Sequence, residues 1–268
     1  MAAPTIGLVI STMNAGIHKL NTLLTPSWDS IVVVHQITDG REQEYHAQHA
    51  LYRSQGVHVI VQHQPGLSYS RNTGLDAMTA DYALITDDDV QFPAHVITRL
   101  HEAIAALPGS DIITLRVSTP EGVPFKKYAD YVFRHTRRSV ARVSSIEMLV
   151  SVSWWRNVNI RFNTHFGLGA MFATGEEYVF MTAAIRADSR AWYFPATVAL
   201  HPIVSSGKIL DATQLSNKGA MISCVHGMFA LPFIIGFALR KHALYRQQFS
   251  FFTAMRHMHN GIKKYQAL

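Results

Sequence analysis

Three consecutive aspartates, Asp87, Asp88 and Asp89, are the residues of this 268-residue sequence best suited to chemistry. They directly follow residues 82–86 (YALIT), an apolar run that predicts a buried strand. Ligands of open α/β sheets bind at the carboxyl ends of strands, and three adjacent carboxylates at such an end repel one another. A divalent cation would balance this charge, and carboxylates that share a cation with phosphate oxygens favour Mg²⁺ or Mn²⁺ over Zn²⁺. We therefore interpret the triplet as a metal site; the alternative is a solvated acidic turn before a helix near Pro93.

A second motif, residues 66–75 (GLSYSRNTGL), precedes that strand. Ser68 is a good helix N-cap, which places Arg71 in the first helical turn. A cation there opposes the helix dipole, so we expect Arg71 to be held by a phosphate or by the aspartate cluster. The alternative is a surface arginine on an ordinary capped helix.

Glycines and glutamates form a third motif, residues 166–170 (FGLGA) followed by Gly175, Glu176 and Glu177. Glycine allows a backbone to approach a bound molecule closely, and the positive end of a helix dipole stabilises carboxylates. A glutamate at this place is either a structural helix-start residue or a general base aimed at a hydroxyl group.

The fourth motif is His201 with Pro202, followed by Ser205, Ser206, Gly207 and Lys208. A lone histidine is usually structural. A flexible loop that carries a lysine could, however, close over phosphates, which makes His201 and Lys208 candidates for the same site.

Strand and helix signals alternate in the first half of the chain. Apolar β-rich runs predict strands at residues 5–11, 31–35, 57–61, 82–86 and 111–117, and the segments between them predict helices at 41–54, 68–79 and 93–107. This alternation predicts right-handed βαβ units and a mainly parallel sheet flanked by helices, which is an α/β fold. The second half predicts a strand at 146–155, a helix at 175–187, an extended run at 191–200 and helices from Asp211 onward, as one catalytic domain with a C-terminal helical extension.

Charge is divided unevenly along the chain. Residues 1–110 hold 5 Lys/Arg and 10 Asp/Glu, residues 111–268 hold 19 and 8, and no acidic residue follows Asp211. The division favours a cation in the first half and an anionic partner for the second. A nucleic-acid-binding protein is the rival class, because basic and aromatic side chains mix at residues 126–142. The acidic first half and the aspartate cluster count against it, and we expect no nucleic-acid partner.

The location is expected to be cytoplasmic. Cys224 is the only cysteine, which excludes an intrachain disulfide and favours a reducing compartment. Residues 1–5 lack a basic stretch, and the apolar run after them fits a first strand better than a signal peptide.

The extension leaves two interpretations open. Residues 225–239 (VHGMFALPFIIGFAL) are fewer than the roughly 20 that a spanning helix needs, so we expect no transmembrane segment. Residues 240–268 carry six Lys/Arg and no acid, and an apolar helical face is formed by Tyr245, Phe249, Phe252 and Met255. This segment is either a basic helix on the anionic inner face of a cell membrane or a helix packed on the catalytic domain.

The four motifs, in this order, resemble the inverting, GT-A-fold glycosyltransferases of family 2. The family's first strand ends in a polar loop, here Ser11-Thr12-Met13-Asn14 without the usual proline. Its Gly-x-Ser-x-x-Arg-Asn-x-Gly, Asp-x-Asp and Gly-Glu-Asp motifs correspond to Gly66–Gly74, Asp87–Asp89 and Gly175–Glu177, and a later histidine to His201. The resemblance covers roughly residues 5–205.

The resemblance implies a Rossmann-like GT-A catalytic domain at residues 1–205, with a donor half at about 1–110, an acceptor half at about 111–205 and the extension at 206–268. It implies a nucleotide-diphosphate sugar as donor, expected to be linked to UDP. The acceptor would be a hydroxyl group of a glycan or lipid-linked oligosaccharide in bacterial surface polysaccharide synthesis. A sugar nucleotidyltransferase is the nearest alternative enzyme, but it needs a Gly-rich, Lys/Arg-bearing loop that residues 13–20 do not match.

Roles for individual residues follow from the same resemblance. Glu177 would be the general base and Glu176 would hold the acceptor. A Mn²⁺ or Mg²⁺ ion would lie on the Asp87, Asp88 and Asp89 cluster with His201; the direct ligand is Asp88 or Asp89, with Asp87 towards the ribose. The family's second strand ends in acidic residues that read the nucleobase, and here Gln36 and Asp39 are the candidates. The donor-binding candidates are Ser11, Thr12, Asn14, Gln36, Asp39, Ser68, Arg71, Asn72, Asp87 and Lys208.

Overall fold

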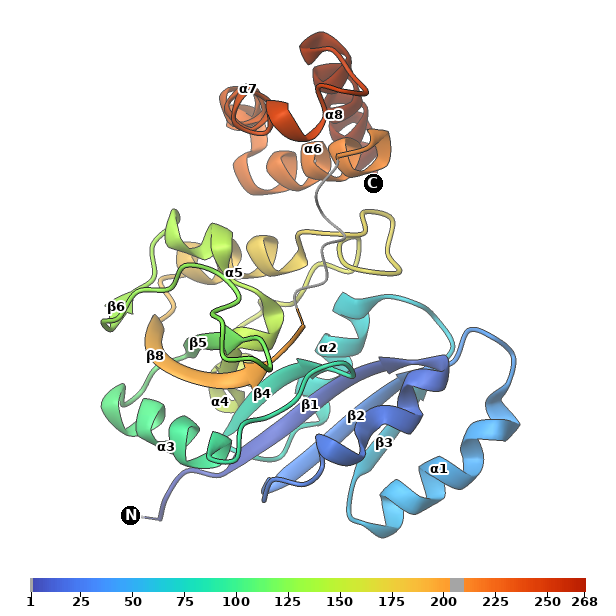
Figure 1. The fold of residues 1–268 in the computed structure, drawn as a ribbon, viewed down its shortest axis with the longest axis vertical. Helices are drawn as coiled ribbons and strands as arrows, with labels where there is room; N and C mark the ends of the chain where they lie inside the picture. Colours follow the sequence, from blue (N-terminus) through green and yellow to red (C-terminus); the bar gives the residue numbers. More distant parts are fainter. Residues whose placement is uncertain (1, 203–209) are drawn as a thin grey trace.

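The first four strands predicted from the sequence lie next to one another in a single sheet (Figure 1). The computed structural model describes residues 2–202 and 210–268, and within these residues eight strands form one sheet in the order β3-β2-β1-β4-β7-β5-β8-β6. The strands are β1 (Ile6–Met13), β2 (Ser30–Gln36), β3 (His58–Gln62), β4 (Tyr82–Asp87), β5 (Ile112–Ser118), β6 (Phe133–Arg134), β7 (Met148–Ser151) and β8 (Ala191–Leu200). The neighbours β3-β2-β1-β4 and the pair β5-β8 are parallel, which confirms the prediction of a mainly parallel sheet.

Strand β7 corrects the expected strand at 146–155. It is four residues long, runs antiparallel to both neighbours, and separates β4 from β5. The strand ends at Ser151 because its hydroxyl accepts a hydrogen bond from the Trp154 amide and caps helix α4 (Val152–Asn157). The tryptophans that looked like strand residues, Trp154 and Trp155, therefore lie on a helix.

Helices cover both faces of the sheet. They are α1 (Glu42–Ser54), α2 (Leu67–Ala77), α3 (Val96–Ala106), α4 and α5 (Glu176–Arg186). Alternate residues of β1 point to opposite faces, so that Leu8 and Ile10 join one core with α1 and α3 while Val9 joins the other with α2, α4 and α5. Because β1 is buried on both faces, it reads as a continuous apolar run.

Three helices form the C-terminal extension: α6 (Ala212–His226), α7 (Ala230–Arg240) and α8 (Phe251–Gln266). A third core, which includes Phe166, Phe172 and Val179 of the catalytic part, holds them together. Helices α6 and α8 approach very closely, because a Cβ atom on Gly219 would overlap the backbone of Met258, and one on Gly261 would overlap the Ser216 carbonyl oxygen. By length and composition alone, the stretch Ala212–Arg240 would suffice to cross a membrane. The chain changes direction at Gly227, where φ is +55°, and so divides this stretch into α6 and α7.

Packing also decides how the apolar face expected at residues 240–268 is used. Tyr245 is buried, and Phe249 and Met255 pack against the third core. Phe252 alone of the four predicted side chains is largely exposed, at 82%. In the described residues this face therefore fits the packed-helix interpretation.

Candidate functional site

Arg71 joins the carboxyl end of β4 to the start of α5. Its guanidinium donates hydrogen bonds to Asp87 Oδ1 at 3.1 Å and to Glu176 Oε1 at 2.9 Å, and its side chain is fully buried. A third bond goes to the hydroxyl of Ser145 at 2.6 Å. Burial alone would lower the pKa of Arg71, but the charges of Asp87 and Glu176 outweigh it and raise the pKa, so the arginine stays ionised. We expected Arg71 to bind either a phosphate or the aspartate cluster. In the structure it binds Asp87 of the cluster and, in addition, Glu176.

Helix α2, which carries Arg71, begins earlier than the sequence indicated. Helix α2 starts at Leu67 with Gly66 as its N-cap, so Ser68 is not the cap. The buried Ser68 hydroxyl instead donates to the Phe166 carbonyl oxygen at 2.6 Å, across a sequence distance of 98 residues. The bond ties the second motif to the third.

The aspartates of the cluster have three different partners. Asp87 faces Arg71, whereas Asp88 Oδ2 accepts a hydrogen bond from the Thr12 hydroxyl at 2.5 Å. A Cβ atom at Gly16 would overlap that Asp88 carboxylate and the Thr12 hydroxyl, so a larger residue there would have to displace this bonded pair. Asp89 Oδ2 lies 3.2 Å from His201 Nε2.

Asp89 and His201 are two adjacent side chains that could both serve as ligands of a divalent cation. His201 Nδ1 lies 2.7 Å from the Pro202 carbonyl oxygen, which can only accept, so Nδ1 must carry the proton. A backbone carbonyl that fixes the tautomer in this way leaves Nε2 free to ligate, an arrangement typical of metal-binding histidines. Across residues 2–202 and 210–268, no three His, Cys, Asp or Glu side chains converge as a complete metal site. The pair would therefore need oxygen ligands from water or from a ligand, which Mg²⁺ and Mn²⁺ accept.

Glu177, like Asp88, has no cationic partner within salt-bridge distance among the described residues. We expected Glu176 to hold the acceptor. Glu176 is only 5% exposed, however, and Arg71 binds its carboxylate, so little of it is accessible to an acceptor hydroxyl. Glu177, the next residue on α5, is partly exposed. Burial raises the pKa of Glu177 to about 7, the charge of Glu176 adds to the shift, and Arg71 opposes it. A carboxylate with a pKa near neutrality can both accept and release a proton.

Several residues expected to bind the donor instead form hydrogen bonds within the protein. Gln36 Oε1 accepts from the Gly66 amide at 2.7 Å, and Asn72 exchanges two hydrogen bonds with the backbone of Phe162. The buried Ser11 hydroxyl accepts from Ser70 at 2.9 Å. These side chains shape the loops around the strand ends rather than presenting free polar groups.

Two other candidates lie at the rim of the strand ends. Asn14 has φ of +49°, and its side-chain oxygen accepts from the Thr38 amide at 2.8 Å, which links the end of β1 to the end of β2. Asp39 is exposed and accepts from the Tyr45 hydroxyl at 2.6 Å, a bond that lowers the pKa of Asp39. Lys208 lies outside the described residues.

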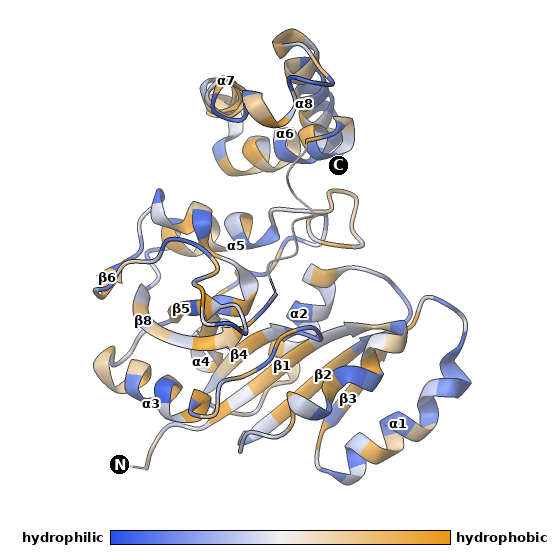
Figure 2. Cartoon of the chain, in the orientation of Figure 1, coloured by the Kyte–Doolittle hydropathy of each residue, from blue (hydrophilic) through white to orange (hydrophobic). Residues whose placement is uncertain are grey.

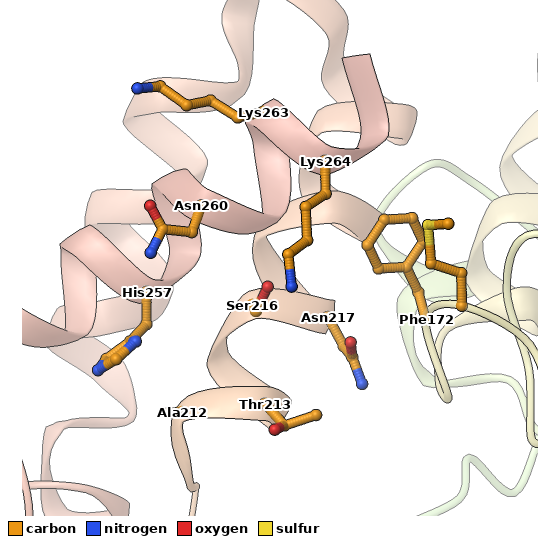
Figure 3. Close-up of a pocket in the computed structure, with 10 residues that line it drawn as sticks. Phe172, Ala212, Thr213, Ser216, Asn217, His257, Asn260, Lys263 and Lys264 are labelled. Atoms are coloured by element: carbon orange, nitrogen blue, oxygen red, sulfur yellow. The ribbon is translucent and has the colours of Figure 1, made fainter. Parts of the chain in front are cut away.

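A pocket of about 490 Å³ lies where the extension meets the loop that follows Gly169 (Figure 3). Phe172 closes one side of it, and Ser216 and Asn217 of α6 face Lys264 of α8 across it. Helix α6 adjoins both the pocket and the start of α5: Ser216 and Asn217 line the pocket, and Met221 packs against Gly175.

Two residues that the sequence motifs did not indicate also belong to this site. Ser145 binds Arg71, and nothing in its local sequence distinguishes it. Lys218 of α6 donates to the Thr174 hydroxyl at 3.0 Å; burial lowers the pKa of Lys218 below its usual value, and the charges of Glu177 and Glu176 offset only part of this. The available signal for Lys218 was that it is the one Lys or Arg in residues 212–226 of the sequence.

Comparison with known proteins identifies the fold and the family. No match was found among curated proteins. The structure is similar to S. aureus TarS 1–349 in complex with UDP, at 17% identity and a TM-score of 0.60, covering 91% of this chain and 73% of that one. It is also similar to TarS 1–349 in complex with UDP-GlcNAc, at 15% identity and a TM-score of 0.55, covering 91% and 74%. Against the longer TarS chain the identity is 16%, the TM-score 0.58, and the coverage 89% of this chain and 43% of that one.

At such identities these likenesses establish a shared GT-A-like fold and no more. The sequence itself carries the family assignment, because residues 16–164 match the model of glycosyl transferase family 2, which is more than half of the chain. The matched region contains the second motif and the aspartate cluster, both of which belong to the site described above. This chain therefore belongs to glycosyl transferase family 2.

Proposed function

We propose that the protein transfers a sugar from a UDP-sugar to a hydroxyl group of a glycan acceptor, with inversion at the anomeric carbon. The observation that carries the proposal is the buried Arg71, which binds Asp87 at the end of β4 and Glu176 at the start of α5. Arg71 thereby brings the aspartate cluster, which would bind the charged donor, near Glu177, which would act as the base. A single displacement requires both groups in one site.

Glu177 is the general base of this proposal. It is partly exposed, its pKa is raised to about 7, and no residue described in the structure neutralises it by an ion pair. Glu176 acts as a positioning residue, because its bond to Arg71 fixes the first turn of α5. Burial lowers the pKa of Lys218, but Lys218 lies close enough to the two glutamates for their charges to oppose this, and when protonated it favours the ionised form of Glu177.

Asp89 and His201 would hold a divalent cation, Mn²⁺ or Mg²⁺, which would supply charge to offset the departing diphosphate. Asp88 keeps its bond to Thr12 and so fixes the end of β1 beside the cluster. Asp87 holds Arg71 and raises the negative potential that draws a cation to the strand ends.

The donor assignment draws on the TarS structures with UDP and UDP-GlcNAc, whose fold this chain shares. Asn14 and Asp39 lie at the rim where a nucleoside would meet the ends of β1 and β2, and Asp39 is an exposed acceptor there. For the acceptor, the pocket of Figure 3 has mixed walls, with Phe172 beside hydroxyl and amide side chains, and a basic edge formed by Lys263 and Lys264. Such a lining suits a glycan that carries an anionic or lipid-linked group at the cytoplasmic face of a membrane.

A donor panel tests this function. The purified protein is melted with UDP, other nucleoside diphosphates and a set of UDP-sugars, each in Mn²⁺ and in EDTA. Ligand at 100 times its Kd adds about 2.7 kcal/mol of stability, which is a clear rise in Tm. We expect UDP and one UDP-sugar to raise the Tm in Mn²⁺ only. Equal shifts in EDTA would refute the metal assignment, and no shift with any nucleotide would refute the transferase proposal.

A further inference from the structure

Helix α7 is apolar on all sides but packed on one side only. Ala230, Ile234 and Ala238 are buried against α6 and α8 at the spacing of one helical face. The opposite surface, which we call the α7 surface, is 39% to 89% exposed and consists of Met228, Phe229, Leu231, Phe233, Ile235 and Leu239. Figure 2 shows apolar colour around α7 at the end of the molecule away from the central sheet.

Such a surface is unusual for a folded protein in water. Single exposed apolar side chains are ordinary, whereas a contiguous group of them marks a contact with another molecule or with lipid. The exposed positions 231–239 of α7 include no polar side chain, so this part of the helix offers a partner no side-chain hydrogen bond.

Basic side chains border the α7 surface at both ends. Arg240 and Lys241 follow α7 directly and are exposed. At the other end, Leu231 shares a shallow apolar groove with Arg256 and His259 of α8. Residues 212–268 hold seven Lys/Arg and no Asp/Glu, so helices α6 to α8 contain no acidic side chain that could neutralise them.

We infer that the α7 surface docks on an anionic lipid bilayer. An apolar helix face with a basic border is the pattern of a helix that lies in the plane of a membrane interface, with its cations at the headgroups. A second copy of this chain fits less well, because pairing two α7 surfaces would bring two basic borders together. This inference does not depend on the proposed transfer reaction.

The membrane contact inferred here is not formed by the apolar face of residues 240–268, for which the sequence left membrane binding and packing both open. The apolar face of residues 240–268 is largely spent on packing, whereas α7, too short to span, is long enough to lie along a surface. Residues 240–268 contribute charge to the border rather than the apolar face.

Vesicle flotation tests the inference, using the full chain with vesicles of phosphatidylcholine alone or of phosphatidylcholine mixed with phosphatidylglycerol. The apolar variant is Leu231→Gln with Leu239→Gln, and its matched control is Leu51→Gln with Val123→Gln, which are exposed apolar residues elsewhere. We expect wild type and control to float with anionic vesicles. The apolar variant should bind these vesicles at least about ten-fold more weakly than wild type. Equal flotation of the apolar variant and wild type would overturn the inference.

A charge variant keeps the test decisive should the apolar variant fold poorly. It replaces the border residues Arg240, Lys241 and Arg256 by glutamine, and its control replaces the exposed Lys127, Arg137 and Arg138. The charge variant should lose binding to anionic vesicles, and added salt should weaken wild-type binding. Equal wild-type binding to neutral vesicles would refute the anionic partner. Light scattering that shows a wild-type dimer, dissociated by Leu231→Gln with Leu239→Gln, would instead identify a second copy as the occupant.

Discussion

Arg71 controls the geometry of the site at the scale of single residues. It is a buried cation between two carboxylates, and it connects elements that lie 105 residues apart in sequence. Asp87 and Glu176 are both ion-paired with Arg71, whereas Glu177 has no ion pair and its pKa is raised. The sequence motifs indicated these residue types, but the pairing of Arg71 with Glu176 depends on how α5 is placed.

Removing the Arg71 charge should be costly, because it leaves Asp87 and Glu176 without a counterion. We expect Arg71→Met to lower the free energy of unfolding by about 3–5 kcal/mol. The control is Arg190→Met, which breaks a pair with Asp111 in which Arg190 is 59% exposed, and should cost less than about 1 kcal/mol. Urea unfolding of the two variants measures both values, and equal losses would show that the Arg71 network carries no special weight.

The raised pKa of Glu177 predicts the pH dependence of the reaction. A general base must be ionised, and the ionised fraction grows as the pH rises through its pKa of about 7. The initial rate at saturating donor should therefore increase through neutral pH and level off above it. Arg71 lowers the pKa of Glu177, so a folded Arg71 variant should shift the profile to higher pH. A rate independent of pH between about pH 6 and about pH 8 would contradict this role for Glu177.

Elements differ in how far the sequence determined them. Strands β1 to β4 and helices α1 to α3 lie close to their predicted positions, because each strand is a continuous apolar run and the connections are short. Strand β7 was mispredicted because the Ser151 cap turns an apolar run into a helix. The exposure of α7 could not be predicted either, since the sequence alone does not say which side of an apolar helix the neighbouring helices cover.

Close contact between α6 and α8 gives a prediction at the element scale. Gly261→Ala would place a Cβ atom against the Ser216 carbonyl oxygen, which is backbone and cannot move aside. We expect a loss of about 1–3 kcal/mol from overpacking. Gly236→Ala is the matched control on α7, where no atom lies within 4 Å of the added Cβ atom, and it should be neutral or stabilising by up to about 1 kcal/mol. Thermal melts compare them, and a stable Gly261→Ala protein would contradict the close packing.

At the scale of the whole molecule, the site is assembled from distant parts of the chain. The aspartate cluster comes from the first half, Glu177 from the second, and Lys218 from the extension. The motifs predicted the first two, whereas Lys218 enters only through the packing of α6 on the start of α5. The extension therefore serves two ends: α6 borders the site, and α7 carries the apolar surface.

The central claim, that Glu177 is the base of a sugar transfer, is tested most directly by measuring kcat and the Kd for UDP on Glu177→Gln. Glutamine keeps the size of the side chain but cannot take the proton. We predict a loss of roughly 10²–10⁴-fold in kcat with an unchanged Kd for UDP, and no loss in the exposed control Glu121→Gln. A Glu177→Gln protein with wild-type kcat would contradict the account.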